Sequence, residues 1–404
     1  MVSQRSRIES HRRSAVSAVL ATAAVGVPVF VGGAYAAASA LGVAAPHVMA
    51  RWLLTPPSRR AKVFPRRDIA ASSHPRPFPV ADAALPETVP WKGTDIPVED
   101  FLRRTHTNCF VIIRDGNMVR EWYRDGFGPA TPHWAYSVSK SLVSLLAGLA
   151  IEHGTLHESD LLVDVLPQLR SDTDYDTVTI ADLLDMVSGI DVPENDSPLK
   201  PLTGTAHMTI TTDLDRFLRE HRQLAHPPGS TGEYRSIDTQ LLATAVATAE
   251  GASLSELLGA QIWEPVGAQD PASWSLDRDG GREKAFIGVN ATARDLAKIG
   301  QCVLDDGMAG DTRVLPEAWI KRIRTPAPRP VEFSPGISAP YSAQWWHPEG
   351  GTGEDFSAVG VHGQYLYIHP PTRTVIVKLS DHGLAQHEEE TVDAFRALCT
   401  PVWL

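Results

Sequence analysis

The chain has 404 residues, 43% of them apolar and 21% charged, with a formal net charge of −11. This length and composition indicate a globular protein with a large buried core, and three widely spaced cysteines imply neither a disulfide framework nor a cysteine metal site. Residues 68–404 hold 27 basic and 47 acidic side chains, so we expect no binding to nucleic acid.

The N-terminal segment differs from the rest of the chain in composition. Residues 14–50 contain no Asp, Glu, Lys or Arg, and an uncharged stretch of this length can span a bilayer or serve as a secretory signal. We therefore expect residues 1–50 to be a membrane anchor or signal segment. The protein would then be membrane-anchored or secreted, with the rest of the chain outside the cytoplasm.

A basic, proline-rich stretch follows at residues 51–94. We expect it to be a linker that either lies near anionic lipid headgroups or acts as a disordered tether. Alternating apolar patterns begin at about residue 95, so we place one folded domain at residues 95–404.

Patterns in this domain predict its fold class. Residues 108–113 and 118–123 predict a β-hairpin around an Asp-Gly turn. Residues 359–368 and 372–380 predict two more strands, and residues 388–398 predict a helix that packs on them. The long stretch between the two groups of strands is helical in pattern. This order predicts an α+β (α/β) fold: an antiparallel β-sheet flanked by helices, plus an all-helical lobe.

A serine and a lysine lie three residues apart where a long helix is expected to begin. Ser137 and Lys140 precede an apolar run, and this spacing puts both side chains on one helical face. A serine hydroxyl is a poor nucleophile at neutral pH, but a lysine amine in apolar surroundings can lose its proton and accept that of the hydroxyl. The pair is therefore a candidate for attack on a carbonyl carbon. The alternative is a surface serine and lysine without function.

A second Ser-x-x-Lys occurs at Ser197 and Lys200. It follows a polar stretch and encloses Pro198, and a proline-containing loop does not hold two side chains in a fixed relation. We interpret this second pair as part of a solvated loop.

Two further motifs favour a function for Ser137 and Lys140. Tyr234 begins a Tyr-x-Ser sequence after a turn-rich loop, and a phenol beside a lysine amine can pass a proton to a leaving group. Gly363 lies in a strand pattern, where a glycine lets a substrate approach backbone N–H groups. Their alternatives are a packed aromatic residue and an ordinary strand glycine.

In this order, Ser-x-x-Lys at 137–140, Tyr-x-Ser at 234–236 and His-Gly at 362–363 resemble the signature of the serine β-lactamase and penicillin-binding-protein superfamily. The resemblance runs from about residue 95 to the C-terminus. Within this superfamily the chain is most similar to the class C-like esterases and the 6-aminohexanoate-dimer (nylon oligomer) hydrolases, through Leu-Asp-Met-x-Ser-Gly at 184–189 and Gln-Trp-Trp at 344–346.

The resemblance implies roles for individual residues. Ser137 would be the acylated nucleophile, Lys140 its base and Tyr234 the acid that protonates the leaving group. Backbone N–H groups of Ser137 and Gln364 would form the oxyanion hole. The positions expected in the substrate pocket are Tyr136, Ser236, Trp345, His362 and Gly363.

The same resemblance implies a substrate class. We expect a serine hydrolase that cleaves a small-molecule ester or amide, without a metal or a cofactor. Residues 191–196 lack the aromatic side chain that the nylon-oligomer enzymes place against the substrate amide, so we favour esters. A D-alanyl-D-alanine peptidase or β-lactamase ranks second, because His362 stands where a lysine would bind a substrate carboxylate. A non-catalytic sensor that is acylated without turnover is the third alternative.

Overall fold

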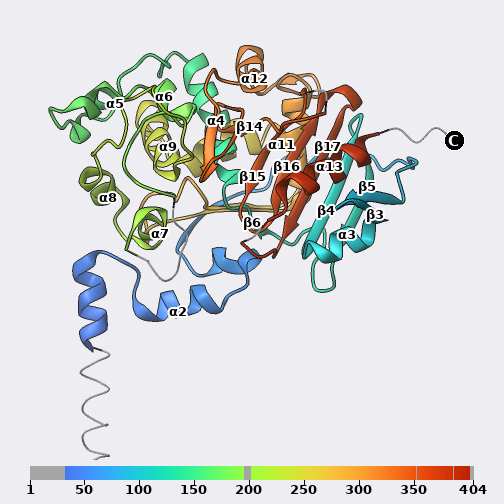
Figure 1. Cartoon of the computed structure of the whole chain (residues 1–404), viewed down its shortest axis with the longest axis horizontal. Helices are drawn as coiled ribbons and strands as arrows, with labels where there is room; N and C mark the ends of the chain where they lie inside the picture. Colours follow the sequence, from blue (N-terminus) through green and yellow to red (C-terminus); the bar gives the residue numbers. More distant parts are fainter. Residues whose placement is uncertain (1–31, 195–201, 352, 385, 401–404) are drawn as a thin grey trace, which may run out of the picture.

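The computed structural model describes residues 32–194, 202–351, 353–384 and 386–400 (Figure 1). At its centre is a seven-stranded sheet in the order β13-β14-β15-β16-β17-β4-β5, and every neighbouring pair is antiparallel. Its strands are β4 (Thr107–Arg114), β5 (Asn117–Tyr123), β13 (Tyr341–Ser342), β14 (Trp345–Trp346), β15 (Phe356–Gly360), β16 (Gln364–His369) and β17 (Thr374–Ser380).

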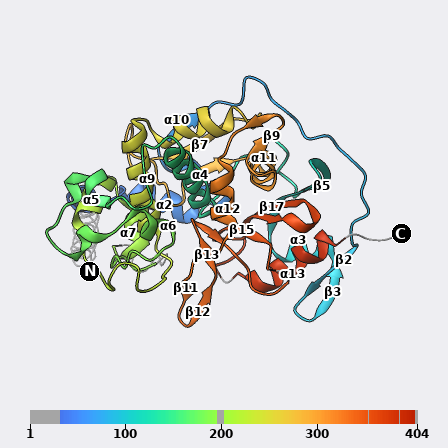
Figure 2. The ribbon, with the colours of Figure 1, turned by 90° about the horizontal axis from the view of Figure 1, so that it is seen from above.

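Alternation along the strands gives the sheet two apolar faces. On β4, Cys109 and Val111 belong to the larger core, whereas Phe110 and Ile112 belong to a second cluster on the other face, as expected when successive side chains point to opposite sides. Helix α11 (Ala293–Leu304) covers the first face, and α3 (Val98–Arg104) and α13 (Glu388–Cys399) cover the second (Figure 2). The sheet is therefore buried on both sides.

A four-stranded sheet in the order β1-β7-β8-β6 lies beside helix α4 (Val138–Glu152), where the N–H of Val289 donates to the hydroxyl of Ser139. Its members are β1 (Arg66–Ile69), β7 (Ala272–Ser275), β8 (Val289–Ala291) and β6 (His133–Trp134). Three two-stranded pairs complete the strands: β2 (Thr88–Trp91) with β3 (Thr94–Pro97), β9 (Met308–Ala309) with β10 (Thr312–Arg313), and β11 (Val331–Ser334) with β12 (Ile337–Ala339).

The helical lobe lies at the left in Figure 1, and its helices pack around α4 (Val138–Glu152) and α9 (Ser236–Glu250). Residues 138–150 of α4 are all buried, so this helix is a core element between the lobe and the sheet. Further helices are α5 (Leu162–Val165), α6 (Ile180–Leu184), α7 (Gly204–Ile210), α8 (Leu214–Glu220), α10 (Leu254–Leu258) and α12 (Glu317–Arg324).

Most of the elements predicted from the sequence are present in this architecture. The antiparallel sheet with flanking helices and a helical lobe is confirmed, as are the hairpin β4–β5 and the C-terminal helix α13. The single strand expected over 359–368 is wrong, because the chain turns at 361–363 and forms β15 and β16 instead. The Ser197/Lys200 pair lies outside the described residues.

The stretch 51–94 is more ordered than the expected linker. We call α2 (Pro46–Leu54) and the 3₁₀-helix Pro57–Lys62 the N-terminal arm; in Figure 1 it runs in blue beneath the body of the molecule. Phe64 and Ile69 are buried in the main core. Apolar burial therefore holds much of this stretch on the domain, despite its many prolines and basic residues.

Among the described residues, no single helix combines the length and hydropathy of a membrane span. A pair bent by 76°, Ser236–Glu250 with Leu254–Trp263, passes that test on length and composition alone.

Candidate active site

The site begins at the junction of β6 and α4. Tyr136 adopts a left-handed backbone with φ of 49°, which costs about 1–2 kcal/mol for a residue with a side chain. Its ring packs against those of Trp134, at a centroid distance of 4.6 Å, and His362, at 5.0 Å. This packing holds the sharp bend, and Ser137 becomes the first residue before a long buried helix.

Ser137 and Lys140 come together as their spacing predicts. The amine of Lys140 donates to the hydroxyl of Ser137 over 2.8 Å and to the carbonyl of Phe286 over 3.2 Å. The lysine is 1% exposed. Burial in general favours the neutral form of an amine, so the surroundings suit a lysine that accepts a proton. Ser137 also lies at the helix N-terminus, where free N–H groups and the helix dipole favour negative charge.

Tyr234 reaches the same point from the segment before α9. Its backbone N–H donates to the carbonyl of Glu332 over 2.8 Å, and its ring packs against Trp346 at a centroid distance of 5.4 Å. The Lys140 amine lies 4.8 Å from the centre of the Tyr234 ring. The structure thus brings together the three side chains singled out from the sequence.

The two expected oxyanion groups meet at Gly360. This residue ends β15 and pairs with Gln364, which begins β16. A Cβ atom on Gly360 would lie 3.1 Å from the nitrogen of Ser137 and 3.1 Å from Cβ of Gln364. The start of α4 and the start of β16 are therefore in close contact, with room for no side chain between them.

The turn between β15 and β16 contains His362 and Gly363, both with positive φ, of 69° and 82°. The N–H of Gly363 donates to the side chain of Gln386, so it is not directed at a substrate. The ring of His362 faces the carbonyl of His382 through Nδ1, at 2.8 Å, and burial lowers the pKa of His362. His362 is therefore a neutral wall residue at neutral pH.

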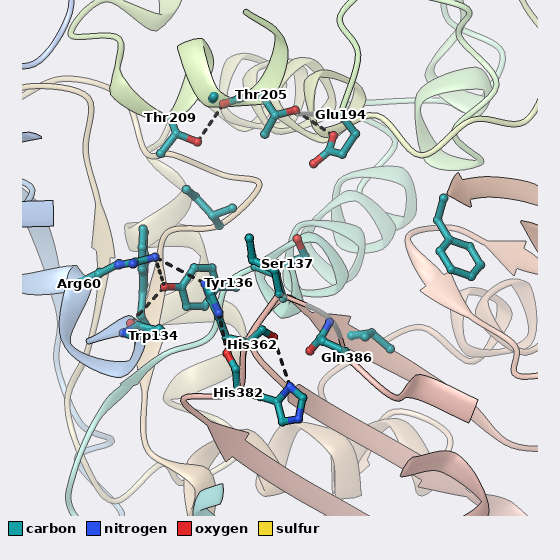
Figure 3. Close-up of a pocket in the computed structure, with 18 of the residues that line it drawn as sticks. Arg60, Trp134, Tyr136, Ser137, Glu194, Thr205, Thr209, His362, His382 and Gln386 are labelled. Carbon is teal, nitrogen blue, oxygen red and sulfur yellow. Dashed lines mark hydrogen bonds between the residues drawn. The ribbon is translucent and has the colours of Figure 1, made fainter. Parts of the chain in front are cut away.

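A cavity of about 500 Å³ opens over Ser137. Tyr136 and His362 line it (Figure 3), and so does Tyr234. Trp345, expected in the pocket, is fully buried and packs edge-on to Phe356, whereas its neighbour Trp346 lines the cavity. Adjacent residues on a strand face opposite sides, which explains why only one of the two tryptophans reaches the cavity.

Glu194 is a further polar residue of the cavity, which the sequence did not predict. Its carboxylate faces the cavity and accepts hydrogen bonds from the backbone N–H of Ser236 (2.9 Å), the hydroxyl of Ser236 (2.8 Å) and the hydroxyl of Thr205 (2.8 Å). The expected pocket residue Ser236 is therefore buried and committed to this carboxylate. No motif marks Glu194, because it is one of several polar residues in a loop.

The N-terminal arm was also missed as part of the site. Trp52, Leu53, Pro57 and Arg60 line the cavity together with Ser137. Only tertiary contacts place them there, and a proline-rich basic stretch carries no local pattern that predicts such a role.

Among the described residues, no group of three or more His, Cys, Asp or Glu side chains is arranged to hold a metal ion. The hydroxyl of Ser137, the amine of Lys140 and the phenol of Tyr234 come together in this site, beside the start of α4.

Comparisons with known proteins agree with this geometry. The family model described as Beta-lactamase matches residues 103–398. The 6-aminohexanoate-dimer hydrolase of Paenarthrobacter ureafaciens is 31% identical over 295 residues, which cover 70% of this chain and 74% of that protein.

Solved structures share the fold. A Bacillus anthracis structure assigned as a 6-aminohexanoate-dimer hydrolase superposes with a TM-score of 0.75 at 23% identity, over 88% of this chain and 94% of that one. A family VIII carboxylesterase superposes with a TM-score of 0.58 at 16% identity, over 74% and 95% of the two chains. From the family match and the hydrolase relative, we conclude that the chain is a hydrolase-type member of the Beta-lactamase family, within the serine β-lactamase and penicillin-binding-protein superfamily.

Proposed function

We propose that the protein is a serine hydrolase that cleaves carboxylic ester or amide bonds through an acyl-enzyme on Ser137. The observation that carries this proposal is the 2.8 Å contact between the Lys140 amine and the Ser137 hydroxyl, in a cavity that Tyr234 also lines. Nucleophile and base within hydrogen-bond distance are the arrangement that covalent catalysis requires.

The reaction proceeds in two halves. Neutral Lys140 takes the Ser137 proton as Oγ attacks the carbonyl carbon, and backbone N–H groups of Ser137 and Gln364 stabilise the oxyanion. The tetrahedral intermediate collapses, the bond to the alcohol or amine breaks, and Tyr234 protonates that leaving group while the Lys140 proton replaces its own. Water then attacks the acyl ester, which releases the acid and restores Ser137.

Esters are the preferred class. The described part of the loop after Met186, residues 187–194, contains no aromatic side chain that could contact a substrate amide. An ester has the better leaving group, so it needs less assistance from such a contact.

The test is hydrolysis of 4-nitrophenyl acetate and butyrate by the full-length protein and by Ser137→Ala. Turnover that disappears in this variant, with unchanged circular dichroism, is the expected result. Ser197→Ala is the matched control, since Ser197 belongs to the second Ser-x-x-Lys, and it should hydrolyse both esters at the wild-type rate. Activity of Ser137→Ala close to wild type would contradict the proposal.

A single burst of nitrophenolate without turnover would identify an acylated sensor instead. Nitrocefin and a D-alanyl-D-alanine peptide in parallel reactions distinguish the β-lactamase and peptidase alternatives, which would require faster hydrolysis of those compounds than of the esters.

We also propose that the N-terminal segment holds the enzyme at a membrane, outside the cytoplasm. Support comes from the uncharged stretch 14–50 and from α2, where Leu54 is 85% exposed in the same helix as Arg51. Apolar side chains next to basic ones suit a lipid surface. The full-length protein should stay in the membrane fraction after alkaline extraction, and recovery in the soluble fraction would contradict this.

A further inference from the structure

Arg60 belongs to a rigid wall of the cavity. The N-terminal arm precedes residue 103, where the family match begins, and it is fixed to the far end of the chain: the N–H and hydroxyl of Ser58 donate to Asp381 over 2.7 and 2.9 Å. Ala61, one residue after Arg60, is 3% exposed. The guanidinium of Arg60 is thus held at the cavity by a packed backbone.

The contacts of Arg60 hold its side chain in place without neutralising it. Nε donates to the carbonyl of Thr55 over 3.2 Å, and Nη1 lies 3.4 Å from the Tyr136 hydroxyl and 3.4 Å from Nε2 of His362. The guanidinium also stacks over the Trp52 ring at 5.1 Å. These partners are all uncharged, and for Nη2 the described residues provide no acceptor.

The acids near Arg60 are already engaged. Among the described residues, no carboxylate lies within 4.0 Å of its guanidinium. Asp381 accepts from Ser58 and pairs with Arg124 at 3.6 Å, and Glu194 accepts three hydrogen bonds, as given above. Glu388 also lines the cavity, and its carboxylate forms no ion pair with Arg60; burial raises its pKa. Among the described residues that line the cavity, Arg60 is the one Lys or Arg side chain, and it forms no ion pair with a described carboxylate.

We propose that Arg60 binds a carboxylate on the substrate, so that the enzyme prefers esters or amides carrying a negative charge several bonds from the scissile carbonyl. This inference rests on the proposed hydrolase activity and specifies its substrate class. A guanidinium remains charged at every physiological pH, and its planar N–H groups match the two oxygens of a carboxylate. Figure 3 shows the Tyr136 ring between Arg60 and Ser137, which sets the separation between the charge and the reacting carbon. Because His362 stands where a lysine would bind a substrate carboxylate, we expected weak binding of such substrates. Arg60, from another part of the chain, would supply the missing positive charge.

Matched substrates test this directly. Mono-4-nitrophenyl glutarate and 4-nitrophenyl 5-methylhexanoate differ only in a terminal carboxylate against an isopropyl group, and 3-acetoxybenzoate and 3-isopropylphenyl acetate place the same difference on the leaving group. The full-length protein should show the higher kcat/KM for the anionic member of at least one pair. Arg60→Gln should lower that kcat/KM about 10- to 100-fold, mostly through KM, as expected for loss of a charged hydrogen bond. The neutral ester should change less than about threefold.

Arg59→Gln is the matched control, because Arg59 carries the same charge one residue earlier and does not line the cavity. It should leave both pairs unchanged. Equal losses on anionic and neutral esters in Arg60→Gln would show that Arg60 only supports Tyr136, and would overturn the proposal, as would the absence of any preference for the anionic members in the wild-type protein.

A binding measurement separates this inference from the hydrolase proposal. Calorimetry with glutarate and benzoate on the Ser137→Ala protein needs no turnover. Binding that Arg60→Gln abolishes would support the anion site even if no ester is hydrolysed, whereas binding that persists in Arg60→Gln, or no binding at all, would overturn it.

Discussion

Replacing Gly360 with alanine tests the proposed oxyanion hole, because Gly360 lies against both the nitrogen of Ser137 and the side chain of Gln364. The added Cβ would lie 2.7 Å from the carbonyl oxygen of Ala135 and 3.1 Å from the nitrogen of Ser137. An ordinary contact begins at 3.4 Å, so the start of α4 and β15 must separate by about 0.7 Å, and displacements near 1 Å cost about 100-fold in rate. Loss of an oxyanion donor costs about 10²–10³ in kcat. We therefore expect Gly360→Ala to lower kcat by about 10²–10³.

The variant should nevertheless fold. Overpacking by one methyl group costs about 1–3 kcal/mol, less than the 5–15 kcal/mol by which domains are stable. The assay is kcat for 4-nitrophenyl butyrate alongside urea unfolding, with Gly128→Ala as control because its Cβ would meet nothing closer than 4.0 Å. A Gly360→Ala enzyme with wild-type kcat would refute the placement of the oxyanion hole between Ser137 and Gln364.

Three further changes test the site and its surroundings. Lys140→Met should lower the single-turnover acylation rate on an ester about 10²–10⁴-fold through loss of the base; an unchanged rate would exclude Lys140 as the base. Burial lowers the pKa of His347 to about 4, below the 6.5 of an unfolded histidine, so stability falls as pH drops from 6.5 to 4 because only the unfolded state takes up the proton. In urea unfolding, His347→Gln should remove up to about 3 kcal/mol of that decrease, and an identical slope would contradict this. Burial lowers the pKa of Lys378 to about 7, so at pH 7 the unfolded state holds the lysine proton more strongly than the folded state, and Lys378→Met should be the more stable protein. This difference in the free energy of unfolding should shrink by about 3 kcal/mol at pH 10. A pH-independent difference would show that the lysine titrates normally.

Local sequence patterns predicted those elements and contacts that depend on residues close together in the chain. The β4–β5 hairpin follows from an Asp-Gly turn between two apolar alternations, and Ser137 and Lys140 meet because three residues are nearly one helical turn. Their meeting with Tyr234 followed from the family signature, since no local pattern links positions almost a hundred residues apart.

What the sequence did not reveal depends on long-range contacts. Trp345 and Trp346 are neighbours of the same residue type, so the sequence does not indicate which of them faces the cavity. The register of β14 in the sheet decides this. The turn at His362 places a histidine in a left-handed conformation that apolar alternation does not predict. Arg60 reaches the cavity because Ser58 binds Asp381, a partner 323 positions away.

That last contact also determines when the cavity is completed. Synthesis at about 5–20 residues per second would separate the emergence of Ser58 and Asp381 by roughly 15–65 s. Throughout this interval the residues of α4, with Ser137 and Lys140, have already been synthesised. The part of the wall that contains Arg60 still lacks Asp381, the partner that holds it. Helix α4 also lacks β15 and β16, which pack against it and emerge shortly before Asp381, so the Ser137–Lys140 pair and the wall that contains Arg60 would be completed together, at the end of folding.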